Sequence, residues 1–334
     1  MTLLAQAPER APGAAEMVVR DGRVLYQHLY GVADLKTGAP ITAHTNFRLA
    51  SVTKQFTAMS VMLLVADGRL RYDEHLTEIF PGFPKFGDGI TVRNLLNHTS
   101  GLQDYEDLMD QQRWNPARQI QDAEVLDLLE HTTTTKFPPG SRFEYSNSGY
   151  VVLGLIVAKI SGMPFGDFLR QRIFAPLGMS NSIVYQKGRN EVANRAFGYT
   201  GQGGAWQETD QSPTSATLGD GGVYSSLDDL AKWYRALDEN KLLRAAEMAP
   251  ALTPPADLPP GSVKLEGLTA GYGFGWVIDI FEGHRRYWHH GETVGFRASV
   301  ERFPDQHLAI VVLQNRSEPD PFSAGVELAK KYLR

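Results

Sequence analysis

The sequence predicts an α/β fold of the α+β type, in which one antiparallel sheet is built from both chain ends, flanked by helices and interrupted by an inserted, mostly helical lobe. Strand-like runs open the chain around a hairpin turn, helical patterns fill its middle, and strand-like runs return near the C-terminus. We therefore expect residues 1–334 to form a single domain. Its sheet lobe would comprise about 1–50 and 262–334, and its helical lobe about 51–261.

The first strand pair is predicted by Asp21-Gly22, which separates two apolar-rich runs. Asp-Gly between such runs favours a tight, primed turn. The hairpin should begin near Val18 and return through Arg23 to Tyr30.

Helical patterns begin with Thr53–Ala66, and Gly68 just beyond is a typical C-terminal stop. Shorter helical patterns follow at Thr91–Asn97, Asp122–His131, Ser148–Ile160 and Phe165–Phe174. Ser226-Leu227-Asp228-Asp229 is typical of a capping box, and the helix it starts should reach about Leu237.

The C-terminal part contains four strand-like runs and a closing amphipathic helix. The strands are expected at Tyr272–Phe281, Arg285–His289, Phe296–Phe303 and Leu308–Gln314, and the helix at Phe322–Tyr332. The glycine-rich stretch Gly271–Gly275 is interpreted as strand, because no strand–turn–helix pattern surrounds it as a dinucleotide-binding loop would require.

Composition narrows the function classes. The net charge of −5 is mild and no block of like charges forms a basic patch, so no nucleic-acid partner is expected. The absence of cysteine excludes disulfides, thiol nucleophiles and cysteine-ligated zinc. The longest apolar stretch, Tyr150–Ile160, is too short to span a bilayer, so no membrane span is expected.

The N-terminus leaves the localisation open. Met1–Ala15 has only Leu3-Leu4 as an apolar core and carries Glu9 and Arg10, which is not typical of a signal peptide. A cytoplasmic location is expected for the chain as written, and a periplasmic or secreted one if a precursor has been trimmed.

Ser51-Val52-Thr53-Lys54 is the most informative motif. Residues three apart share a helix face, so Lys54 can reach the Ser51 hydroxyl at the head of a helix. Free backbone N–H groups at a helix N-terminus favour developing negative charge. Under these conditions a weak hydroxyl nucleophile becomes an acylation site. The structural alternatives are a serine N-cap and a solvated lysine.

Two further motifs support this interpretation, since roughly half of one Ser-x-x-Lys match is expected by chance in a chain of this composition. Tyr145-Ser146-Asn147 stands between the turn Pro138-Pro139-Gly140 and an apolar helical run. His289-His290-Gly291 stands between two C-terminal strands. Three motifs in this order and context are far less expected by chance.

With these motifs the chain resembles the penicillin-recognising serine hydrolases, which include class C β-lactamases, D-Ala-D-Ala carboxypeptidases and β-lactamase-like carboxylesterases. A related motif set is Ser-x-x-Lys with Ser-Asp-Asn and Lys-Thr-Gly. The sequence departs from it twice: Tyr145 begins the second motif, as in the class C branch, and His289 stands where lysine usually begins the third. Other stretches similar to the family are Asn97-His98-Thr99-Ser100-Gly101-Leu102, Pro176-Leu177-Gly178-Met179, Gly221-Gly222 and Gly295-Phe296.

The resemblance implies a β-lactamase-like catalytic domain that needs neither metal nor cofactor. Ser51 would be the nucleophile and Tyr145 the general base. A phenol has a pKa near ~10, so a tyrosine needs nearby positive charge to act as a base at neutral pH, and Lys54 would supply it. The alternative for Tyr145 is an aromatic residue that only packs and hydrogen-bonds.

The remaining site residues would bind substrate. Asn147 would orient Lys54 and donate to a substrate carbonyl, although a plain helix cap is the alternative. Gly291 would let substrate approach the backbone closely, and the N–H groups of Glu292 and Ser51 would form the oxyanion hole.

His289 sets the expected substrate class. A lysine in the third motif would attract the carboxylate of penicillins and D-Ala peptides, whereas imidazole is largely neutral at pH 7 and gains charge as the pH falls through about 6.5. The alternative is a satisfied structural histidine. His290 should face away as a structural residue, and two adjacent histidines without a third ligand make a poor zinc site.

The predicted function is therefore that of a serine hydrolase forming an acyl-enzyme on Ser51. We expect a β-lactamase-like carboxylesterase or amide hydrolase acting on a small ester, amide or peptide. The first alternative is a D-Ala-D-Ala carboxypeptidase or D-amino-acid peptidase with weak β-lactamase activity. An alternative of another class is a non-catalytic binding or sensor protein that is acylated without turnover. The oligomeric state is left open.

Overall fold

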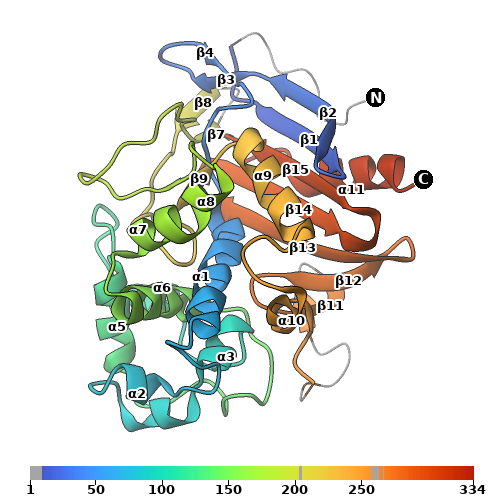
Figure 1. Ribbon diagram of the computed structural model, residues 1–334. Helices are drawn as coiled ribbons and strands as arrows, with labels where there is room; N and C mark the ends of the chain where they lie inside the picture. Colours follow the sequence, from blue (N-terminus) through green and yellow to red (C-terminus); the bar gives the residue numbers. More distant parts are fainter. Residues whose placement is uncertain (1–9, 203–204, 257, 259–262, 266) are drawn as a thin grey trace.

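The computed structural model describes residues 10–202, 205–256, 258, 263–265 and 267–334. Its centre is an eight-stranded antiparallel sheet of order β10-β11-β12-β13-β14-β15-β1-β2 (Figure 1). The strands are β1 (Ala14–Arg20), β2 (Arg23–Tyr30), β10 (Val263–Leu265), β11 (Leu268–Tyr272), β12 (Val277–Phe281), β13 (His284–Thr293), β14 (Phe296–Phe303) and β15 (Leu308–Gln314).

The two ends of the chain meet inside this sheet, as predicted. β1 pairs with β15 along its whole length, with Met17 opposite Val311. The predicted hairpin joins β1 to β2, and Asp21 and Gly22 both adopt positive φ angles, of 51° and 69°. Positive φ at both central residues is the geometry of a type I′ turn, which explains the Asp-Gly pair.

The prediction of one strand over Tyr272–Phe281 is wrong, because the chain turns back between β11 and β12. The N–H of Gly273 donates to the carbonyl of Trp276 at 2.8 Å, and Gly275 has a φ of 77°. A Cβ on Gly275 would lie 2.7 Å from the carbonyl oxygen of Lys54. Only Gly271 and Tyr272 of the glycine-rich stretch are therefore strand, and the remaining glycines make a turn against a helix.

The predicted helices between the two halves of the sheet are all present. They are α1 (Lys54–Ala66), α3 (Val92–Leu96), α5 (Asp122–Glu130), α6 (Asn147–Ser161) and α7 (Phe165–Leu169), with a π-helical turn η3 (Arg170–Phe174) after α7. Three short helices were not predicted: α2 (Leu76–Ile79), α4 (Tyr105–Gln111) and α8 (Ala175–Leu177). Nearly every residue of α1 is buried, and α1 packs against α6. This burial places Lys54 deep in the molecule.

Two helices cover opposite faces of the sheet. Alternate residues of β1 point to opposite sides. Met17 belongs to the large core that includes α9 (Leu227–Asp238), whereas Val18 packs with α11 (Pro321–Tyr332). Although α9 falls in the predicted 51–261 lobe, it packs on β1 and β15. One proposed lobe boundary, at 261–262, lies outside the described residues.

Ser226 caps α9 as predicted, with its hydroxyl accepting from the N–H of Asp229 at 3.5 Å. The carboxylate of Asp229 does not complete a capping box. It accepts instead from the N–H and the hydroxyl of Ser182.

A small antiparallel sheet of order β5-β9-β6 joins distant parts of the chain. Its strands are β5 (Phe47–Arg48), β6 (Ile183–Val184) and β9 (Val223–Ser225). β5 ends just before Ser51 and β9 begins just after Gly222, so the sheet brings residues near 220 beside the start of α1.

The other elements are β3 (Val32–Asp34), β4 (Ala39–Pro40), β7 (Tyr199–Gln202), β8 (Ala205–Glu208), α10 (Ala245–Met248) and the 3-10 helices η1 (Ala50–Thr53), η2 (Lys85–Gly89), η4 (Ala249–Leu252) and η5 (Pro304–Gln306).

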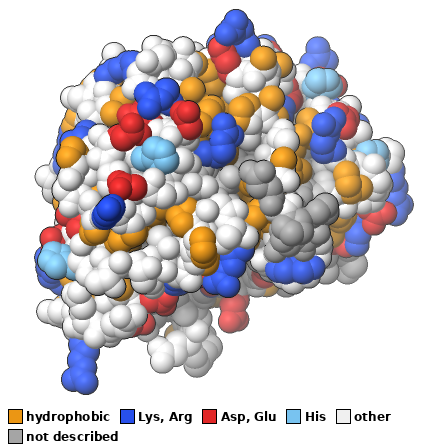
Figure 2. Space-filling model, turned by 90° about the horizontal axis from the view of Figure 1, so that it is seen from below, with side chains coloured by type: hydrophobic (Ala, Val, Ile, Leu, Met, Phe, Trp, Pro, Cys, Tyr) orange, Lys and Arg blue, Asp and Glu red, His pale blue; other side chains and the backbone are white. Residues whose placement is uncertain are grey.

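Figure 2 shows acidic and basic side chains interspersed over one face of the molecule, in line with the mild net charge. Across the described residues, no single helix is long and apolar enough to cross a membrane. Only α6 together with residues 165–177, bent at 74°, passes that test of length and composition jointly. Of the N-terminal stretch, Met1–Glu9 lies outside the described residues, while Ala14 and Ala15 belong to β1.

Candidate active site

Ser51 and Lys54 are in direct contact at the junction of η1 and α1. The ammonium of Lys54 donates to Ser51 Oγ at 3.1 Å, to Asn147 Oδ1 at 2.9 Å and to the backbone carbonyl of Asp220 at 3.0 Å. An ammonium has three donors, and all three are used here. Lys54 is also fully buried, so the alternative of a solvated lysine is wrong.

The alternative role of Ser51 as a helix cap is also wrong. Leu49 and Thr53 occupy the N-cap positions of η1 and α1, and neither helix has a side-chain capping bond. Ala50, directly before Ser51, has a φ of 46°, which is uncommon for a residue with a side chain. Strained backbone of this kind clusters at functional sites, where the surrounding structure enforces it.

Tyr145 lies two residues before α6, with its ring beside the ammonium. The Nζ atom of Lys54 is 4.9 Å from the centroid of the Tyr145 ring. The Tyr145 hydroxyl is buried and has no hydrogen-bond partner among the described residues. Its oxygen is therefore not committed to a structural contact, unlike the three donors of Lys54.

The strand β13 runs past Ser51 at close range. β13 pairs with β14 up to Thr293 but with β12 only as far as Trp288, and η1 packs against it. A Cβ on Gly291 would overlap the carbonyl oxygen of Leu49 and lie 3.3 Å from the amide nitrogen of Ser51. The absence of a side chain at Gly291 therefore lets the two backbones meet.

A cleft of about 630 Å³ follows this strand from Ser51 to the start of α11. Of the predicted site residues, Ser51, Tyr145, His289, Gly291 and Glu292 line it, and Lys54 and Asn147 lie behind Ser51. The structure thus brings the seven predicted residues into one place.

Glu292 extends into solvent at the cleft edge. Its side chain is 72% exposed and forms an ion pair of 2.7 Å with Arg297, which lies directly opposite it in β14. Any role of Glu292 in binding an oxyanion would belong to its backbone N–H rather than to its carboxylate.

His289 is buried and held in one tautomer. Its Nδ1 lies 2.6 Å from the carbonyl of His290 and therefore carries the proton, so Nε2 accepts from the Tyr272 hydroxyl at 3.0 Å. Burial, and then the positive charge of Lys54, lowers the pKa of His289 to about 3. The expectation that His289 becomes charged as the pH falls through 6.5 is therefore wrong.

His290 points to the other face of the sheet, as strand alternation requires. Its ring packs 4.6 Å from that of Trp288 and 4.2 Å from that of Phe322 in α11. The two adjacent histidines therefore cannot share one ion. No group of three or more His, Cys, Asp or Glu within the described ranges is placed to hold a metal.

Asn147 connects Lys54 to two carboxylates that no sequence motif indicated. Its Nδ2 donates to Glu106 Oε1 at 3.3 Å, and its backbone N–H donates to Asp104 Oδ2 at 3.2 Å. Desolvation, and then the charges of Asp104 and Asp220, raises the pKa of the Glu106 carboxyl. Asn147 therefore ties Lys54 to a pair of carboxyl groups.

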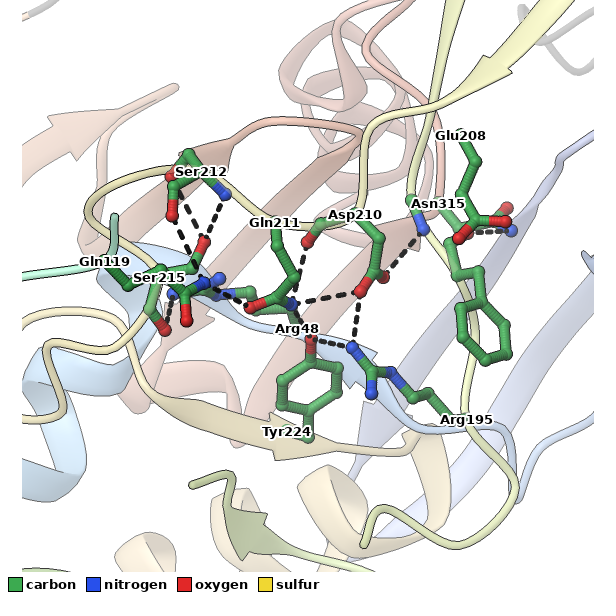
Figure 3. Close-up of polar contacts among 12 residues, drawn as sticks. Arg48, Gln119, Arg195, Glu208, Asp210, Gln211, Ser212, Ser215, Tyr224 and Asn315 are labelled. Carbon is green, nitrogen blue, oxygen red and sulfur yellow. Dashed lines mark hydrogen bonds and ion pairs between the residues drawn. The ribbon is translucent and has the colours of Figure 1, made fainter. Parts of the chain in front are cut away.

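The carbonyl of Asp220 was also missed, although the family-like pair Gly221-Gly222 stands next to it. Figure 3 shows Arg48 of β5 beside Ser215, which precedes this segment. Its guanidinium donates to the carbonyls of Ser215 at 3.2 Å and Gly221 at 3.3 Å. Residues on both sides of Asp220 are thus tied to the strand that leads into Ser51.

This fold, with a lysine-paired serine at its cleft, defines the class of the protein: a serine hydrolase of the penicillin-recognising type. The chain belongs to the Beta-lactamase family, whose sequence profile matches residues 2–332. The predicted resemblance, fold class and serine-hydrolase function are thereby confirmed, and the non-catalytic alternative is left without support.

Curated relatives and solved structures agree with this assignment. Penicillin-binding protein 4* of Bacillus subtilis (strain 168) is 31% identical over 333 residues, which are 95% of this chain and 71% of that protein. D-aminopeptidase of Brucella anthropi is 31% identical over 317 residues, 92% of this chain, but the chain spans only 56% of that protein's length.

Among solved structures, a D-amino acid amidase from Ochrobactrum anthropi SV3 is 29% identical, with a TM-score of 0.78 over 96% of this chain and 94% of that one. An octameric penicillin-binding protein homologue from Pyrococcus abyssi is 27% identical, with a TM-score of 0.82 over 98% of this chain and 74% of that one.

Proposed function

We propose that this protein hydrolyses amide or ester bonds of small substrates that carry a free amine and lack a carboxylate, with D-amino-acid amides as the first candidates. The observation that carries the proposal is the charge of the cleft. A neutral His289 stands where the family usually has a lysine, and carboxylates line the outer part of the cleft.

The outer cleft is acidic. Its lining includes the carboxylates of Glu292, Glu318 and Asp320 and a single guanidinium, that of Arg297, which is already paired with Glu292. A surface of this sign attracts cations and repels a substrate carboxylate. Glu106 accepts a hydrogen bond from the side-chain amide of Asn147. We propose that its carboxylate binds the ammonium group of the substrate.

The proposed chemistry is acyl transfer through Ser51. Tyr145, as phenolate, takes the Ser51 proton while Ser51 Oγ bonds to the substrate carbonyl carbon. The N–H groups of Ser51 and Glu292 would receive the negative charge on the carbonyl oxygen. The C–N or C–O bond then breaks, and the proton on Tyr145 passes to the leaving amine or alcohol. Water, deprotonated by Tyr145, then bonds to the acyl carbon, the bond to Ser51 Oγ breaks, and Tyr145 returns the proton to Ser51.

The hydrogen bonds support Tyr145 rather than Lys54 as the base. All three donors of Lys54 are engaged, which is the arrangement of a protonated ammonium. The Tyr145 hydroxyl, by contrast, is free of partners within the described residues. The Nζ atom of Lys54 lies 4.9 Å from the centre of the Tyr145 ring, beside the proposed base.

The relatives support the substrate class. Two similar proteins are a D-aminopeptidase and a D-amino acid amidase, which supports D-amino-acid amides as candidate substrates here. A second candidate, a D-Ala-D-Ala carboxypeptidase with weak β-lactamase activity, is favoured by the similarity to penicillin-binding protein 4*.

A substrate panel tests the proposal. It comprises D-alanine p-nitroanilide, its N-acetylated form, a neutral chromogenic ester, a chromogenic cephalosporin and an N-acyl-D-Ala-D-Ala peptide. We expect kcat/KM for the free-amine anilide to exceed that for the N-acetylated form and the cephalosporin at least tenfold. A preference for the cephalosporin or the D-Ala-D-Ala peptide would overturn the substrate class.

Glu106→Gln tests the ammonium contact. A charge contact in a partly solvated cleft is worth on the order of 1 kcal/mol, so the preference for the free-amine anilide over its N-acetylated form should fall several-fold. Turnover of the neutral ester serves as the control and should change little. An unchanged preference would show that the amine is bound elsewhere.

A further inference from the structure

We infer that His98 is a positioning residue for Tyr145: it clamps the backbone on both sides of this residue and stacks on its ring. The inference rests on the proposed role of Tyr145 as general base. His98 belongs to the family-like stretch Asn97–Leu102, to which neither the predicted mechanism nor the cleft assigns a role. All six residues of this stretch are buried.

The segment that carries Tyr145 has no helix or strand of its own. Residues 131–146 connect α5 to α6 as turns and irregular chain. Its backbone hydrogen bonds go instead to the buried stretch. The N–H of Lys136 donates to the carbonyl of Gly101 at 2.7 Å, and the N–H of Gly140 donates to that of Thr99 at 2.8 Å.

The two residues that flank Tyr145 are both bonded to His98. The N–H of Glu144 donates to the His98 carbonyl at 3.0 Å, and the N–H of Ser146 donates to His98 Nδ1 at 3.1 Å. The imidazole also lies against the Tyr145 ring, with the ring centroids 4.3 Å apart. One residue therefore contacts the Tyr145 region at three points.

Other aromatic rings hold His98 itself in place. Ring centroids of Tyr150 and Tyr272 lie 5.0 Å and 4.6 Å from that of His98. The φ of His98 is 59°, an uncommon conformation for a residue with a side chain, which persists only where the surroundings enforce it. The residue is only 1% exposed. These features describe a rigid support.

His98 keeps its acceptor over the working pH range. Because Nδ1 accepts from the Ser146 N–H, the ring proton is on Nε2. Burial, and then the charge of Lys54, holds the pKa of His98 well below its usual range. The ring therefore stays neutral and does not become a second donor facing Ser146.

Tyr145 needs such a support because its hydroxyl has no hydrogen-bond partner within the described part of the chain. The position of the phenol oxygen relative to Ser51 then depends on the ring and on the backbone, which are the parts that His98 holds. Small displacements of a catalytic group cost large factors in rate.

The test compares His98→Asn and His98→Ala with the parent on a neutral chromogenic ester. Asparagine tolerates positive φ and offers an oxygen acceptor to Ser146, but it lacks the ring. We expect His98→Asn to lower kcat about tenfold with KM within twofold, and His98→Ala to lower kcat further, to about one hundredth. If His98→Ala fails to fold, His98→Asn decides alone.

Asp229→Asn is the matched control, because it alters another fully buried acceptor of backbone N–H groups, in the first turn of α9. It should lower the melting temperature while leaving kcat within twofold. If kcat falls as much in Asp229→Asn as in His98→Asn, the effect is general destabilisation and the inference is wrong.

Tyr145→Phe separates this inference from the proposed function. A Tyr145→Phe variant with parental kcat would overturn the role of Tyr145 as base and the clamp inference with it. If Tyr145→Phe is inactive but both His98 variants keep parental kcat, only the clamp inference is overturned. In the Tyr145→Phe background, His98→Asn should cause no further loss; a full additional tenfold loss would mean that His98 acts elsewhere.

Discussion

Gly291 and Leu49 approach each other so closely that no side chain fits between them, since a Cβ on Gly291 would overlap the Leu49 carbonyl. This contact sets the distance between β13 and the backbone of Ser51. Gly291→Ala should therefore displace the strand and lower kcat at least a hundredfold, because removing oxyanion-hole geometry costs that much. Gly82→Ala is the control, since open space surrounds Gly82. Parental kcat in Gly291→Ala would mean that β13 does not position the reacting groups.

Ser51→Ala should abolish turnover and labelling by a fluorophosphonate. Within the described residues its hydroxyl makes one hydrogen bond, to Lys54, so its loss should cost only about 1 kcal/mol of stability and a few degrees of melting temperature. Thermal unfolding and ester turnover measure the two effects. Residual parental turnover would show that another residue is the nucleophile.

Lys54→Ala and Tyr145→Phe should each lower kcat/KM by roughly 10²–10⁴, since both are proposed to serve one proton transfer. The Nζ atom of Lys54 lies 4.9 Å from the centroid of the Tyr145 ring, so the effects of the two substitutions should be coupled. The double variant should be little worse than the poorer single variant. Losses that multiply would show that the two residues act independently.

The preference against carboxylate-bearing substrates should not change between pH 7.5 and 5.5. His289 titrates at about 3, so it stays neutral throughout this range. The ratio of cephalosporin to neutral-ester turnover measures this directly. His289→Lys should raise the ratio several-fold at most, because burial and the charge of Lys54 both disfavour a second ammonium. A ratio that rises near pH 6.5 in the parent would contradict the buried, neutral His289.

His289 should also make the fold less stable in acid. Its pKa is about 3 in the folded chain and about 6.5 when unfolded, so below pH 6.5 the unfolded chain binds a proton that the folded chain excludes. Stability should therefore fall with pH from 6.5 towards 3, by at most about 1.4 kcal/mol per pH unit.

Asp122 changes the stability in the opposite direction as the pH falls. Burial raises the pKa of its carboxyl to about 8, so the folded chain binds a proton there that the unfolded chain does not. The comparison that isolates the histidine is urea unfolding of the parent and of His289→Asn at pH 7.5 and 5.5. The loss of stability in acid should be smaller in His289→Asn. Equal losses in the two proteins would show that His289 does not titrate as proposed.

Sequence patterns predicted the parts of the fold that depend on neighbours a few residues away. The Asp21-Gly22 hairpin and the helix over Thr53–Ala66 follow from turn chemistry and apolar periodicity. The break between β11 and β12 did not follow, because the turn at Gly275 fits against the carbonyl of Lys54, far away in sequence.

The same division holds in the site. Ser51, Lys54 and Tyr145 were identified because each residue type has a distinctive chemistry and stands in a motif. The Asp220 carbonyl could not be identified in this way, because every residue carries a carbonyl and only folding brings this one to Lys54. Glu106 and His98 were missed for a related reason: they touch the site through Asn147 and through the backbone around Tyr145.

The sequence by itself determined that an imidazole, and not an ammonium, begins the third motif. Only the tertiary structure decided how that imidazole behaves, since the bond from Tyr272, the burial of the ring and the nearby charge of Lys54 all come from distant parts of the chain. Intrinsic chemistry belongs to a residue type and can be predicted from sequence. A shifted pKa belongs to the surroundings, which exist only after the chain has folded.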